Sequence, residues 1–467
     1  MVDDHPGWKP IQTIGVVGMG YVGIPSAVLF AHSERFSQVI GFQRVSSSSG
    51  HKIELLNNGI LPLQGEEPDL AEMLKKVVSS GIFSCTGDFS QVSVCDAVTI
   101  AIQTPFTDPE DLIPDFSALE EGIRVVGRNL TPGSLVVIES TVTPGTTEGF
   151  ARKLLEEESG LEAGKDFFLA HAPERVMVGR LIKNIQEHDR IIGGIDQWST
   201  DRAIELYESV LTTGKVIPMS ATAAEVTKTA ENTFRDLQIA AANQLALYCE
   251  AMGINFYDVR AGIASLKGEG ITRSILWPGA GVGGHCLTKD TYHLERGITI
   301  AGVESLDYPV GMESLYVLAR RINDFMPSHM FWLLSQGLVC AGKEVMGAKI
   351  ALLGWSFMAN TDDARNTPAE SFYNLCLREG AEVRIHDPWV HKYPGVTISS
   401  DLQETVTGSD AIIIFTNHQE YYSIEPAHIM PIVSNKPVIV DGRNVIDPDR
   451  FIGAGFIYKG IGRGDKN

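Results

Sequence analysis

The sequence predicts an α/β protein with two doubly wound parallel sheets joined by a central helical segment. Short apolar runs typical of buried strands alternate with helical segments in residues 13–174, and the alternation returns in residues 349–444. Between these stretches, residues 221–252 form an Ala-rich run without proline, which favours one long helix. Alternating strands and helices favour parallel sheets covered on both faces, because parallel strands need crossover connections.

The length and the changes of texture suggest three domains. The chain has 467 residues, and at about 150 residues per domain this length favours about three domains. The sequence pattern changes from alternating strands and helices to helix alone near residue 220, and it changes back at Pro327. We therefore expect domains at residues 1–219, 220–326 and 327–467, the middle one helical.

Charge and composition exclude several classes of partner. A net charge of −20 disfavours nucleic acid and anionic membrane surfaces. No apolar run approaches the roughly 20 residues of a membrane helix, and the acidic N-terminus lacks the apolar core of a secretion signal. The six cysteines are scattered without metal-ligand spacing, which favours reduced thiols. We expect a cytoplasmic protein that holds no metal.

The first strand-like run, residues 13–17, leads directly into a G-x-G-x-x-G motif, and a helical segment follows. In this context the first glycine permits a tight turn, the second admits a pyrophosphate, and the third lets helix and strand pack. The motif predicts a Rossmann-type dinucleotide site. The residues that we expect to bind the cofactor here are Gly18, Met19, Gly20, Tyr21, Val22 and Gly23.

The second strand, residues 39–42, ends where an acidic residue usually holds the adenosine ribose. This chain has Gln43 there, followed by Arg44 and by serines at 46–49. A neutral amide beside Arg44 and hydroxyls could accept a 2′-phosphate, and Gln43 could equally bond the ribose hydroxyls. NAD and NADP therefore both remain open at this point.

Three further strands of the N-terminal half end in polar residues. Thr104, Thr141 and Glu174 follow the apolar runs at 97–102, 135–138 and 167–172. Ligands of parallel sheets bind at the carboxyl ends of strands, so each of the three is a candidate site residue. Each could also be an ordinary helix cap or turn residue.

The long Ala-rich helix carries a polar stripe. Lys228, Asn232 and Arg235 follow i, i+4, i+7 spacing, so they share one face. Such a stripe is often simply solvated. Alanine and asparagine also allow close helix approach, so a buried interface is the alternative.

Residues 278–290, which we call the glycine–cysteine loop, contain four glycines within six residues, just before Cys286. A Gly-rich loop ahead of a helix lets backbone N–H groups approach an anion, and the helix dipole favours a thiolate. Asp290 lies one helical turn further on. The loop therefore offers a nucleophile, a phosphate cradle and a base, unless it is only a tight turn with a small buried cysteine.

The C-terminal segment repeats the α/β pattern without a complete glycine motif. Apolar runs at 349–355, 382–388, 410–417 and 438–444 predict its strands. A polar loop at 360–367 leads into a helix with Pro368 in its first turn. This domain is expected to bind a nucleotide group other than the cofactor.

Taken together, these motifs resemble the nucleotide-sugar 6-dehydrogenases, the family of UDP-glucose and GDP-mannose dehydrogenases. The resemblance extends from about residue 14 to residue 463. The motifs that carry it are GxGxxG at 18–23, EST at 139–141, PGT at 144–146, APER at 172–175, EVTK at 225–228 with Asn232, GVGGHC at 281–286, TDD at 361–363 with Arg365, and DGRN at 441–444.

The resemblance implies a four-electron oxidation of a primary alcohol, C6 of a sugar nucleotide. Cys286 would form a thiohemiacetal and then a thioester, which water hydrolyses. Lys228 and Asn232 would stabilise alkoxides, Asp290 would activate water with Thr141, and Glu174 would be an acid or base. The residues implied in binding the sugar nucleotide are Glu174, Arg175, Arg235, Arg273, Gly281, Gly283, Gly284, Arg365 and Arg443.

Within the family, His285 resembles the branch that oxidises UDP-N-acetylhexosamines, whereas Lys289-Asp290 resembles the glucose type. The family implies NAD, with NADP not excluded because of Gln43. Met358 follows Phe357 where the family usually has lysine, so one substrate contact is absent or supplied elsewhere. The epimer and the nucleotide stay undetermined.

Other functions remain open: oxidation of UDP-glucose or GDP-mannose, a two-electron hydroxy-acid dehydrogenase in which Cys286 is structural, and a silent sugar-nucleotide-binding subunit. The family resemblance implies a role in polysaccharide biosynthesis. The Ala-rich helix favours a homodimer or a higher homo-oligomer.

Overall fold

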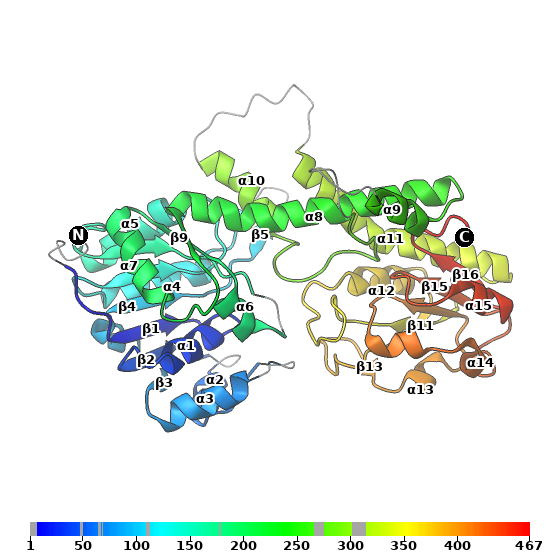
Figure 1. The fold of residues 1–467 in the computed structure, drawn as a ribbon. Helices are drawn as coiled ribbons and strands as arrows, with labels where there is room; N and C mark the ends of the chain where they lie inside the picture. The colour runs from blue at the N-terminus through cyan, green and yellow to red at the C-terminus, as the bar shows by residue number, and fades with distance from the viewer. Residues whose placement is uncertain are drawn as a thin grey trace. The chain divides into compact units, whose positions relative to one another are not determined.

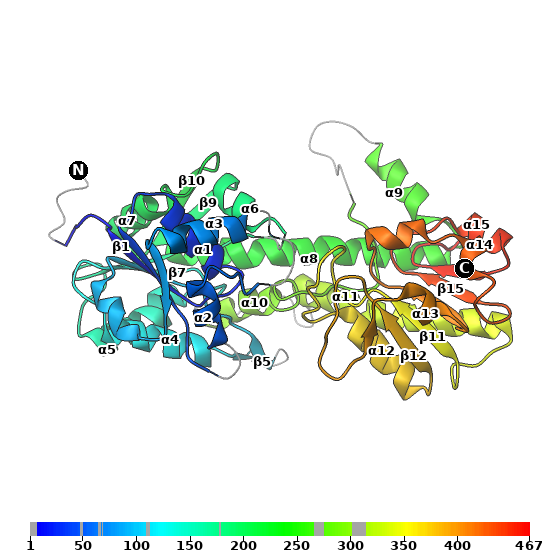
Figure 2. The same cartoon turned by 90° about the horizontal axis from the view of Figure 1, so that it is seen from below.

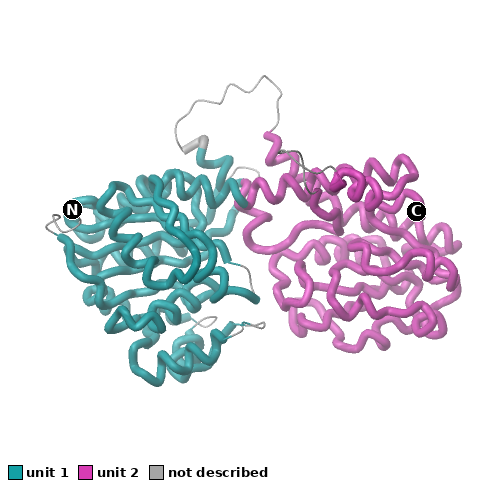
Figure 3. Tube along the Cα trace, in the orientation of Figure 1, with its two compact units in different colours: residues 1–231, 292–309 teal, residues 232–291, 310–467 magenta. Residues whose placement is uncertain are grey.

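The structure is a computed structural model, and it describes residues 7–46, 50–63, 67, 69–108, 113–176, 179–265, 275–300 and 314–467. The chain divides into two compact units (Figure 3). Unit 1 consists of residues 1–231 and 292–309, and unit 2 of residues 232–291 and 310–467. Each unit contains one large sheet.

Unit 1 is built on an eight-stranded sheet with the order β10-β9-β8-β7-β4-β1-β2-β3 (Figure 1). Its strands are β1 (Thr13–Val17), β2 (Gln38–Phe42), β3 (Phe83–Thr86), β4 (Ala97–Ile100), β7 (Leu135–Ile138), β8 (Phe168–His171), β9 (Arg190–Gly194) and β10 (Val216–Ser220). The predicted doubly wound sheet is confirmed for β1, β2, β4, β7 and β8, which pair in parallel. One correction is needed, because β9 runs antiparallel to β8. The edge strand β10 pairs with β9 in parallel, so the last two strands of this sheet run opposite to the rest.

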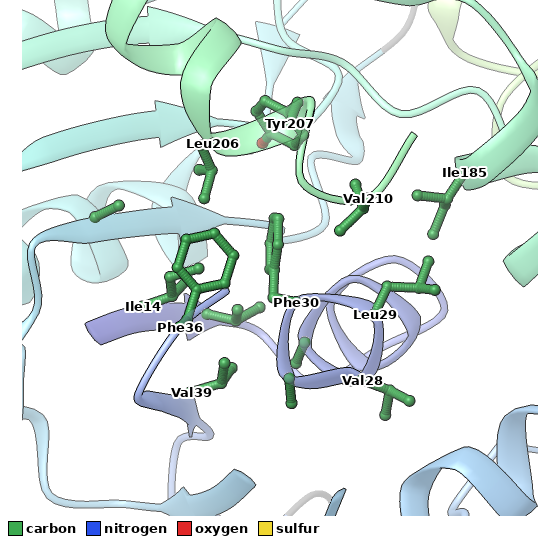
Figure 4. Close-up of a cluster of buried hydrophobic side chains, with 14 of the residues drawn as sticks. Ile14, Val28, Leu29, Phe30, Phe36, Val39, Ile185, Leu206, Tyr207 and Val210 are labelled. Carbon is green, nitrogen blue, oxygen red and sulfur yellow. The ribbon is translucent and has the colours of Figure 1, made fainter. Parts of the chain in front are cut away.

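Helices cover both faces of this sheet. Leu135 and Val137 of β7 belong to one hydrophobic cluster, and Val136 and Ile138 belong to another. Burial on both faces explains why these strands are unbroken apolar runs in the sequence. Figure 4 shows the first cluster, in which Phe30 lies among residues from β1 and from the segment around Tyr207.

The other elements of unit 1 are helices and a small hairpin. They are α1 (Gly23–His32), α2 (His51–Asn57), α3 (Leu70–Ser79), η1 (Phe89–Val94), β5 (Phe106–Asp108), β6 (Ile113–Pro114), α4 (Ser117–Arg128), η2 (Thr147–Ala151), α5 (Arg152–Ser159), α6 (Leu181–Glu187) and α7 (Gln197–Tyr207).

Unit 2 contains a six-stranded parallel sheet with the order β13-β12-β11-β14-β15-β16. Its strands are β11 (Lys349–Leu353), β12 (Glu382–His386), β13 (Ile398–Ser399), β14 (Ala411–Ile414), β15 (Val438–Asp441) and β16 (Ile457–Gly460). The four strands predicted from the sequence are thus confirmed. The short helices here are α12 (Pro368–Arg378), α13 (Leu402–Val406), η3 (Gln419–Ser423), α14 (Pro426–Ile429) and α15 (Pro448–Gly453).

Long helices form the rest of the chain. They are α8 (Ala221–Ala251), α9 (Phe256–Ala264), α10 (Asp290–Ile300) and α11 (Leu315–Ala341). Within unit 2, α8 and α11 lie side by side in both views (Figure 1, Figure 2), joined by a hydrogen bond between Asn243 and Asn323. No helix in the described part of the chain is long and apolar enough to cross a membrane.

Pro327, which the sequence suggested as a domain boundary, lies inside α11 and does not end it. The helix continues because proline removes only one backbone donor, and burial of the following turns compensates for that loss. Met330, Leu333 and Leu334 of those turns are fully buried. The division into three domains stays a prediction.

Candidate active site

The glycines of the G-x-G-x-x-G motif in unit 1 differ in what surrounds them. A Cβ on Gly18 would lie 2.4 Å from the Ala101 carbonyl oxygen, and φ there is +98°. A Cβ on Gly23 would lie 2.0 Å from the Gly18 carbonyl oxygen, so this glycine permits the close helix–strand contact. A Cβ on Gly20 would meet nothing within 4 Å. The middle glycine therefore faces open space, as the dinucleotide interpretation expects.

A cavity of about 570 Å³ opens beside this motif. The Met19 N–H donates to Gln43 Oε1 at 3.2 Å, which joins the motif to the end of β2. The N-cap residue of α1, Val22, makes no side-chain capping bond, which suits a helix N-terminus that meets an anion. The polar and glycine residues that line the cavity are Gly18, Gly20, Gln43, Arg44, Lys52, Gly87, Gln103, Glu121 and Gly122.

Lys52 was not predicted from the sequence. Its ammonium group donates to the Met19 carbonyl oxygen at 3.0 Å, and burial lowers the pKa of Lys52. Lys52 lies on α2, more than 30 residues beyond Met19, so no motif spacing could reveal it. Tyr21 and Val22 lead into α1 outside the cavity lining.

The turn after β7 is tied to α8 by Glu225. Its carboxylate accepts the Gly145 N–H at 2.6 Å and the Thr147 N–H at 2.7 Å. Burial raises the pKa of Glu225 to about 7, against these hydrogen bonds. The sequence showed Glu225 only as part of a motif. The structure gives it the role of holding the PGT turn against the helix that carries Lys228.

Thr104 and Thr141, both predicted from strand ends, are connected to each other. The Thr104 hydroxyl is buried and donates to the Thr141 carbonyl oxygen at 2.5 Å. The buried His293 bonds the Thr104 carbonyl oxygen through Nε2 at 3.1 Å and the Thr143 hydroxyl through Nδ1 at 3.0 Å. His293 thus holds two strand-end loops, a role that the sequence did not show.

Glu174 is buried and forms an ion pair with Arg190. Arg190 also donates to Glu139 Oε1 at 3.0 Å, so one guanidinium lies between two carboxylates. A cation therefore already engages the Glu174 side chain, and the role of Glu174 as an acid or base stays a prediction. Arg175 pairs with Glu231 at 3.6 Å.

Lys228 is buried in unit 1, with 7% of its surface exposed. The positive charge of Lys228 acts on the fully buried His171. Burial, Arg190 and Lys228 together lower the pKa of His171 to about 3. A buried ammonium beside a permanently neutral imidazole is available to a developing anion. Of the other residues on the predicted stripe, Arg235 is exposed on α8.

Asp290 is the centre of the polar groups at the start of α10 in unit 2. It is fully buried. The Asn232 amide donates to its Oδ2 at 2.5 Å, and the Lys289 ammonium donates to its Oδ1 at 3.0 Å. Two of the predicted residues, Asn232 and Asp290, are thereby brought together. Lys289, which the sequence raised only as a clue to substrate type, is the second partner of Asp290.

Cys286 is half-buried at the beginning of the same helical turn. Its carbonyl oxygen accepts the Asp290 N–H at 2.9 Å and the Lys289 N–H at 3.1 Å. The cysteine therefore stands at the positive end of α10, where the helix dipole stabilises a thiolate. The Thr288 hydroxyl donates to the Gly284 carbonyl oxygen at 2.7 Å and closes the turn.

The glycines of the glycine–cysteine loop pack against protein. A Cβ on Gly283 would lie 2.5 Å from the Phe357 side chain, and one on Gly284, where φ is +91°, would lie 2.9 Å from it. A Cβ on Gly281 would lie 2.6 Å from Pro368. These glycines thus have a packing reason, and their predicted contact with a sugar nucleotide stays a prediction.

The arginines predicted to bind substrate have different surroundings. Arg365 forms an ion pair with Asp363 at 2.5 Å, and its carbonyl oxygen accepts the Gly284 N–H. Arg443 donates to the Phe415 carbonyl oxygen at 3.1 Å and to the Gly281 carbonyl oxygen at 3.4 Å. Both arginines therefore support the glycine–cysteine loop. Arg273 lies outside the described residues.

Two residues bear on the predicted substrate type: His285 within the loop, and Met358 outside it. Burial and the cations Lys289 and Arg365 lower the pKa of His285 to about 4, so its imidazole is neutral at physiological pH. The Met358 carbonyl oxygen accepts hydrogen bonds from the hydroxyls of Ser356 and Thr361 at 2.9 and 3.0 Å. The backbone at the missing lysine is thus well held.

A buried chain of hydrogen bonds connects the two ends of the glycine–cysteine loop. Asn243 accepts the Gly279 N–H at 2.9 Å and donates to Asn323, which donates to Asp236 at 2.8 Å. Asp236 pairs with Arg320 at 2.6 Å, and Arg320 approaches the Leu287 carbonyl oxygen at 3.5 Å. The sequence did not reveal this network, because its members lie about 80 residues apart on α8 and α11.

Among the described residues, no group of three or more His, Cys, Asp or Glu side chains could hold a metal ion.

Comparison of the sequence with known protein families shows which family the chain matches. Residues 12–211, 222–312 and 351–448 match the NAD binding domain, the central domain and the UDP binding domain of the UDP-glucose/GDP-mannose dehydrogenase family.

Individual relatives match over nearly their full length. The UDP-N-acetyl-D-mannosamine dehydrogenase of Pyrococcus horikoshii is 39% identical over 97% of this chain and 99% of its own. The crystal structure of the NDP-N-acetyl-D-galactosaminuronic acid dehydrogenase from Methanosarcina mazei is 66% identical, with a TM-score of 0.89, covering 98% of this chain and 96% of that one. The NDP-N-acetyl-D-galactosaminuronic acid dehydrogenase of Ralstonia nicotianae is 31% identical over 94% and 97%. The chain belongs to the UDP-glucose/GDP-mannose dehydrogenase family, as an NAD-dependent oxidoreductase.

Proposed function

We propose that this chain oxidises the C6 hydroxyl of a UDP-N-acetylhexosamine to a carboxylate. The observation that carries the proposal is the half-buried Cys286 at the positive end of α10, one turn before a carboxylate held by Asn232 and Lys289. Relatives named for N-acetylmannosamine and N-acetylgalactosaminuronic acid support the sugar class.

Unit 1 fits the nicotinamide cofactor. Gly20 faces open space, the N-cap residue Val22 of α1 makes no capping bond, and the cavity beside them has a volume of about 570 Å³. When bound, NAD accepts a hydride. The oxidation of an alcohol to an acid releases two hydrides, so two NAD molecules are used in turn.

Cys286 carries out the covalent steps, and Lys228 and Asn232 stabilise the charge that develops. After the first oxidation the Cys286 thiolate adds to the C6 aldehyde, forming a carbon–sulfur bond and an alkoxide that takes up a proton as the thiohemiacetal. Loss of the second hydride to NAD, together with the hydroxyl proton, gives a thioester. Water then cleaves the carbon–sulfur bond to yield the carboxylate, the free thiol and a proton. Lys228 stabilises alkoxides by its charge, and Asn232 does so by hydrogen bonding.

We assign the orientation of water to Asp290, and orientation or proton transfer to Glu174. Asp290 is buried and accepts hydrogen bonds from Asn232 and Lys289, a setting that suits a base that orients water. Glu174 pairs with Arg190, so we assign Glu174 to orientation or to proton transfer.

The neutral imidazole of His285 supports a hexosamine substrate. An acetamido group is uncharged and hydrogen-bonds without an ionic partner, which a neutral imidazole can match. UDP-glucose and GDP-mannose are the alternative substrates, and relatives that act on each have solved structures.

The test counts NADH formed per sugar with UDP-N-acetylmannosamine, UDP-N-acetylgalactosamine, UDP-glucose and GDP-mannose. We expect two per sugar for the wild-type chain and a stall after the aldehyde for Cys286→Ser. The exposed Cys340 provides the control, since Cys340→Ser should behave as the wild type. One NADH per sugar with an active Cys286→Ser variant would point to a two-electron dehydrogenase, and no turnover on any sugar to a silent binding subunit.

We also infer that the chain forms a homodimer through α11. Leu318, Phe325, Trp332 and Val339 recur every seven residues along this helix and are each more than two-fifths exposed. A contiguous apolar stripe of this kind marks an interaction surface. Phe325→Glu should lower the mass measured by light scattering. Leu377→Glu, on an exposed apolar residue of α12, should not change it.

We propose a cytoplasmic location for the enzyme. Its six cysteines are all free thiols, which suits a reducing compartment.

A further inference from the structure

The adenosine end of the cofactor cavity lacks the acidic residue that usually follows the second strand. In doubly wound sheets that residue binds the ribose hydroxyls and disfavours a 2′-phosphate. Here the position holds Gln43, whose Oε1 accepts the Met19 N–H at 3.2 Å. Arg44 follows directly, and a cation at this place is the usual partner of a 2′-phosphate. From β2 alone, the site would not distinguish NAD from NADP.

A carboxylate reaches the same cavity from another element. Glu121 of α4 lines the cavity together with Gln43 and Arg44. Its Oε2 lies 2.9 Å from the Arg44 guanidinium. Because α4 follows β4, this residue lies 77 positions beyond Arg44 in the sequence.

We propose that Glu121 determines the preference of this enzyme for NAD over NADP. The inference rests on the proposed function only in taking NAD as the cofactor. A 2′-phosphate carries about −1.5 to −2 charges at pH 7 and is best bound by a bidentate arginine. Arg44 is the arginine that would make that contact, and Glu121 already pairs with it. The negative charge of Glu121 also repels the phosphate.

The other cation of the cavity does not replace Arg44. The Lys52 ammonium donates to the Met19 carbonyl oxygen at 3.0 Å, on the side of the glycine motif. Binding NADP would therefore require Arg44 to leave Glu121. The carboxylate of Glu121 would then lie unneutralised beside the 2′-phosphate. Both side chains of the pair are more than half exposed, so the effect on selectivity is moderate and the effect on folding small.

The neighbouring Glu120 offers a matched control. It lies on the same helix, one residue earlier, and pairs with Arg124 at 2.9 Å outside the cavity lining. Glu120→Gln removes the same charge from α4 as Glu121→Gln. It leaves Arg44 paired.

The experiment measures kcat/KM for NAD and NADP, and the dissociation constant of each by calorimetry, for the wild type, Glu121→Gln, Glu120→Gln and Glu121→Gln with Arg44→Gln. We expect Glu121→Gln to raise the NADP-to-NAD ratio at least about fivefold in both readouts, since one repulsion is lost and one arginine is released. Glu120→Gln should leave the ratio unchanged, and adding Arg44→Gln should remove the gain.

A ratio within twofold of the wild type for Glu121→Gln in the calorimetric titration would overturn the inference, as would an equal gain with Glu120→Gln. Failure of the proposed function looks different. In that case the wild type would bind NAD but reduce none with any of the sugar nucleotides, and the calorimetric comparison would still decide the role of Glu121.

Discussion

The chain has two glycine-rich segments before helices, one at residues 18–23 and the other at residues 279–284, and they use glycine differently. In the first, Gly20 faces open space beside the cofactor cavity. In the second, a Cβ on any of the four glycines would strike a side chain: one on Gly279 would lie 2.3 Å from Arg443, and one on Gly283 would lie 2.5 Å from Phe357. One segment makes room for a ligand, whereas the other lets protein pack closely around a loop that holds a reactive cysteine.

The largest expected effect concerns the carboxylate that the second segment positions. Asp290→Asn should lower turnover about a thousandfold, within the range of about 10² to 10⁴ for the loss of a general base. Lys289 would also lose the carboxylate that neutralises it in a buried site. Steady-state kinetics measure the change, and the affinity for NAD should stay as in the wild type.

The exposed pair of Asp449 and Lys466 supplies the control for that substitution. Asp449→Asn breaks an ion pair in the same unit, so it should leave turnover unchanged. Equal losses in both variants would mean that Asp290 acts through stability alone.

A pair of alanine substitutions tests the contrast between the two segments directly. Gly284→Ala meets Phe357 at 2.9 Å with φ at +91°, so it should cost about 1–3 kcal/mol of unfolding free energy and at least tenfold in turnover. Gly20→Ala meets nothing within the protein. It should leave stability unchanged while raising the KM for NAD about tenfold, because its methyl group takes up the space of the pyrophosphate.

Chemical denaturation and cofactor titration of the two variants separate these outcomes. If Gly20→Ala lost as much stability as Gly284→Ala, the first segment would also be a packing glycine. If Gly284→Ala changed only substrate affinity, the second segment would be a ligand cradle after all.

The buried network beneath the second segment should have an intermediate effect. Asn323→Ala leaves Asn243 and Asp236 without a shared partner and should cost about 2 kcal/mol. Because the network holds Gly279 and Leu287, we also expect the pH profile of Cys286 alkylation to shift. An unchanged profile at conditions where the variant is fully folded would show that the network does not position the cysteine.

Glu225 and His285 should differ in how their contributions to stability respond to pH. The pKa of Glu225 is raised to about 7 in the folded chain, from an ordinary 4.5. The folded state then holds a proton that the unfolded state has lost, so this residue contributes less stability as the pH rises from about 4.5 to 7. The pKa of His285 is lowered to about 4 from 6.5. The folded state resists its protonation, so this residue contributes less stability as the pH falls from about 6.5 to 4.

Glu225→Gln and His285→Gln should therefore change the pH dependence of unfolding in opposite directions, each by about 3 kcal/mol across its window. Denaturant midpoints at pH 4.5, 6 and 7.5 measure this. Parallel shifts for the two variants would contradict the assignment of opposite signs.

Much of the site follows from local sequence. Hydrophobic runs predicted the central strands of both sheets, because strands buried on both faces must be continuously apolar. The spacing of Gly18, Gly20 and Gly23 predicted the cofactor turn, and the position of Cys286 before a helix predicted the nucleophile. Such features depend on neighbours within a few residues, so sequence alone shows them.

Only the tertiary structure decided which distant groups complete these motifs. Lys52 and Glu121 enter the cofactor cavity from helices outside the motif, Glu225 ties a loop 80 residues away to α8, and Asn243 bonds Asn323 across α8 and α11. The antiparallel β9 and the continuation of α11 through Pro327 were likewise not predicted. The physical reason is the same in each case: the partner of a buried polar group is set by which elements pack together, and local spacing carries no record of that packing.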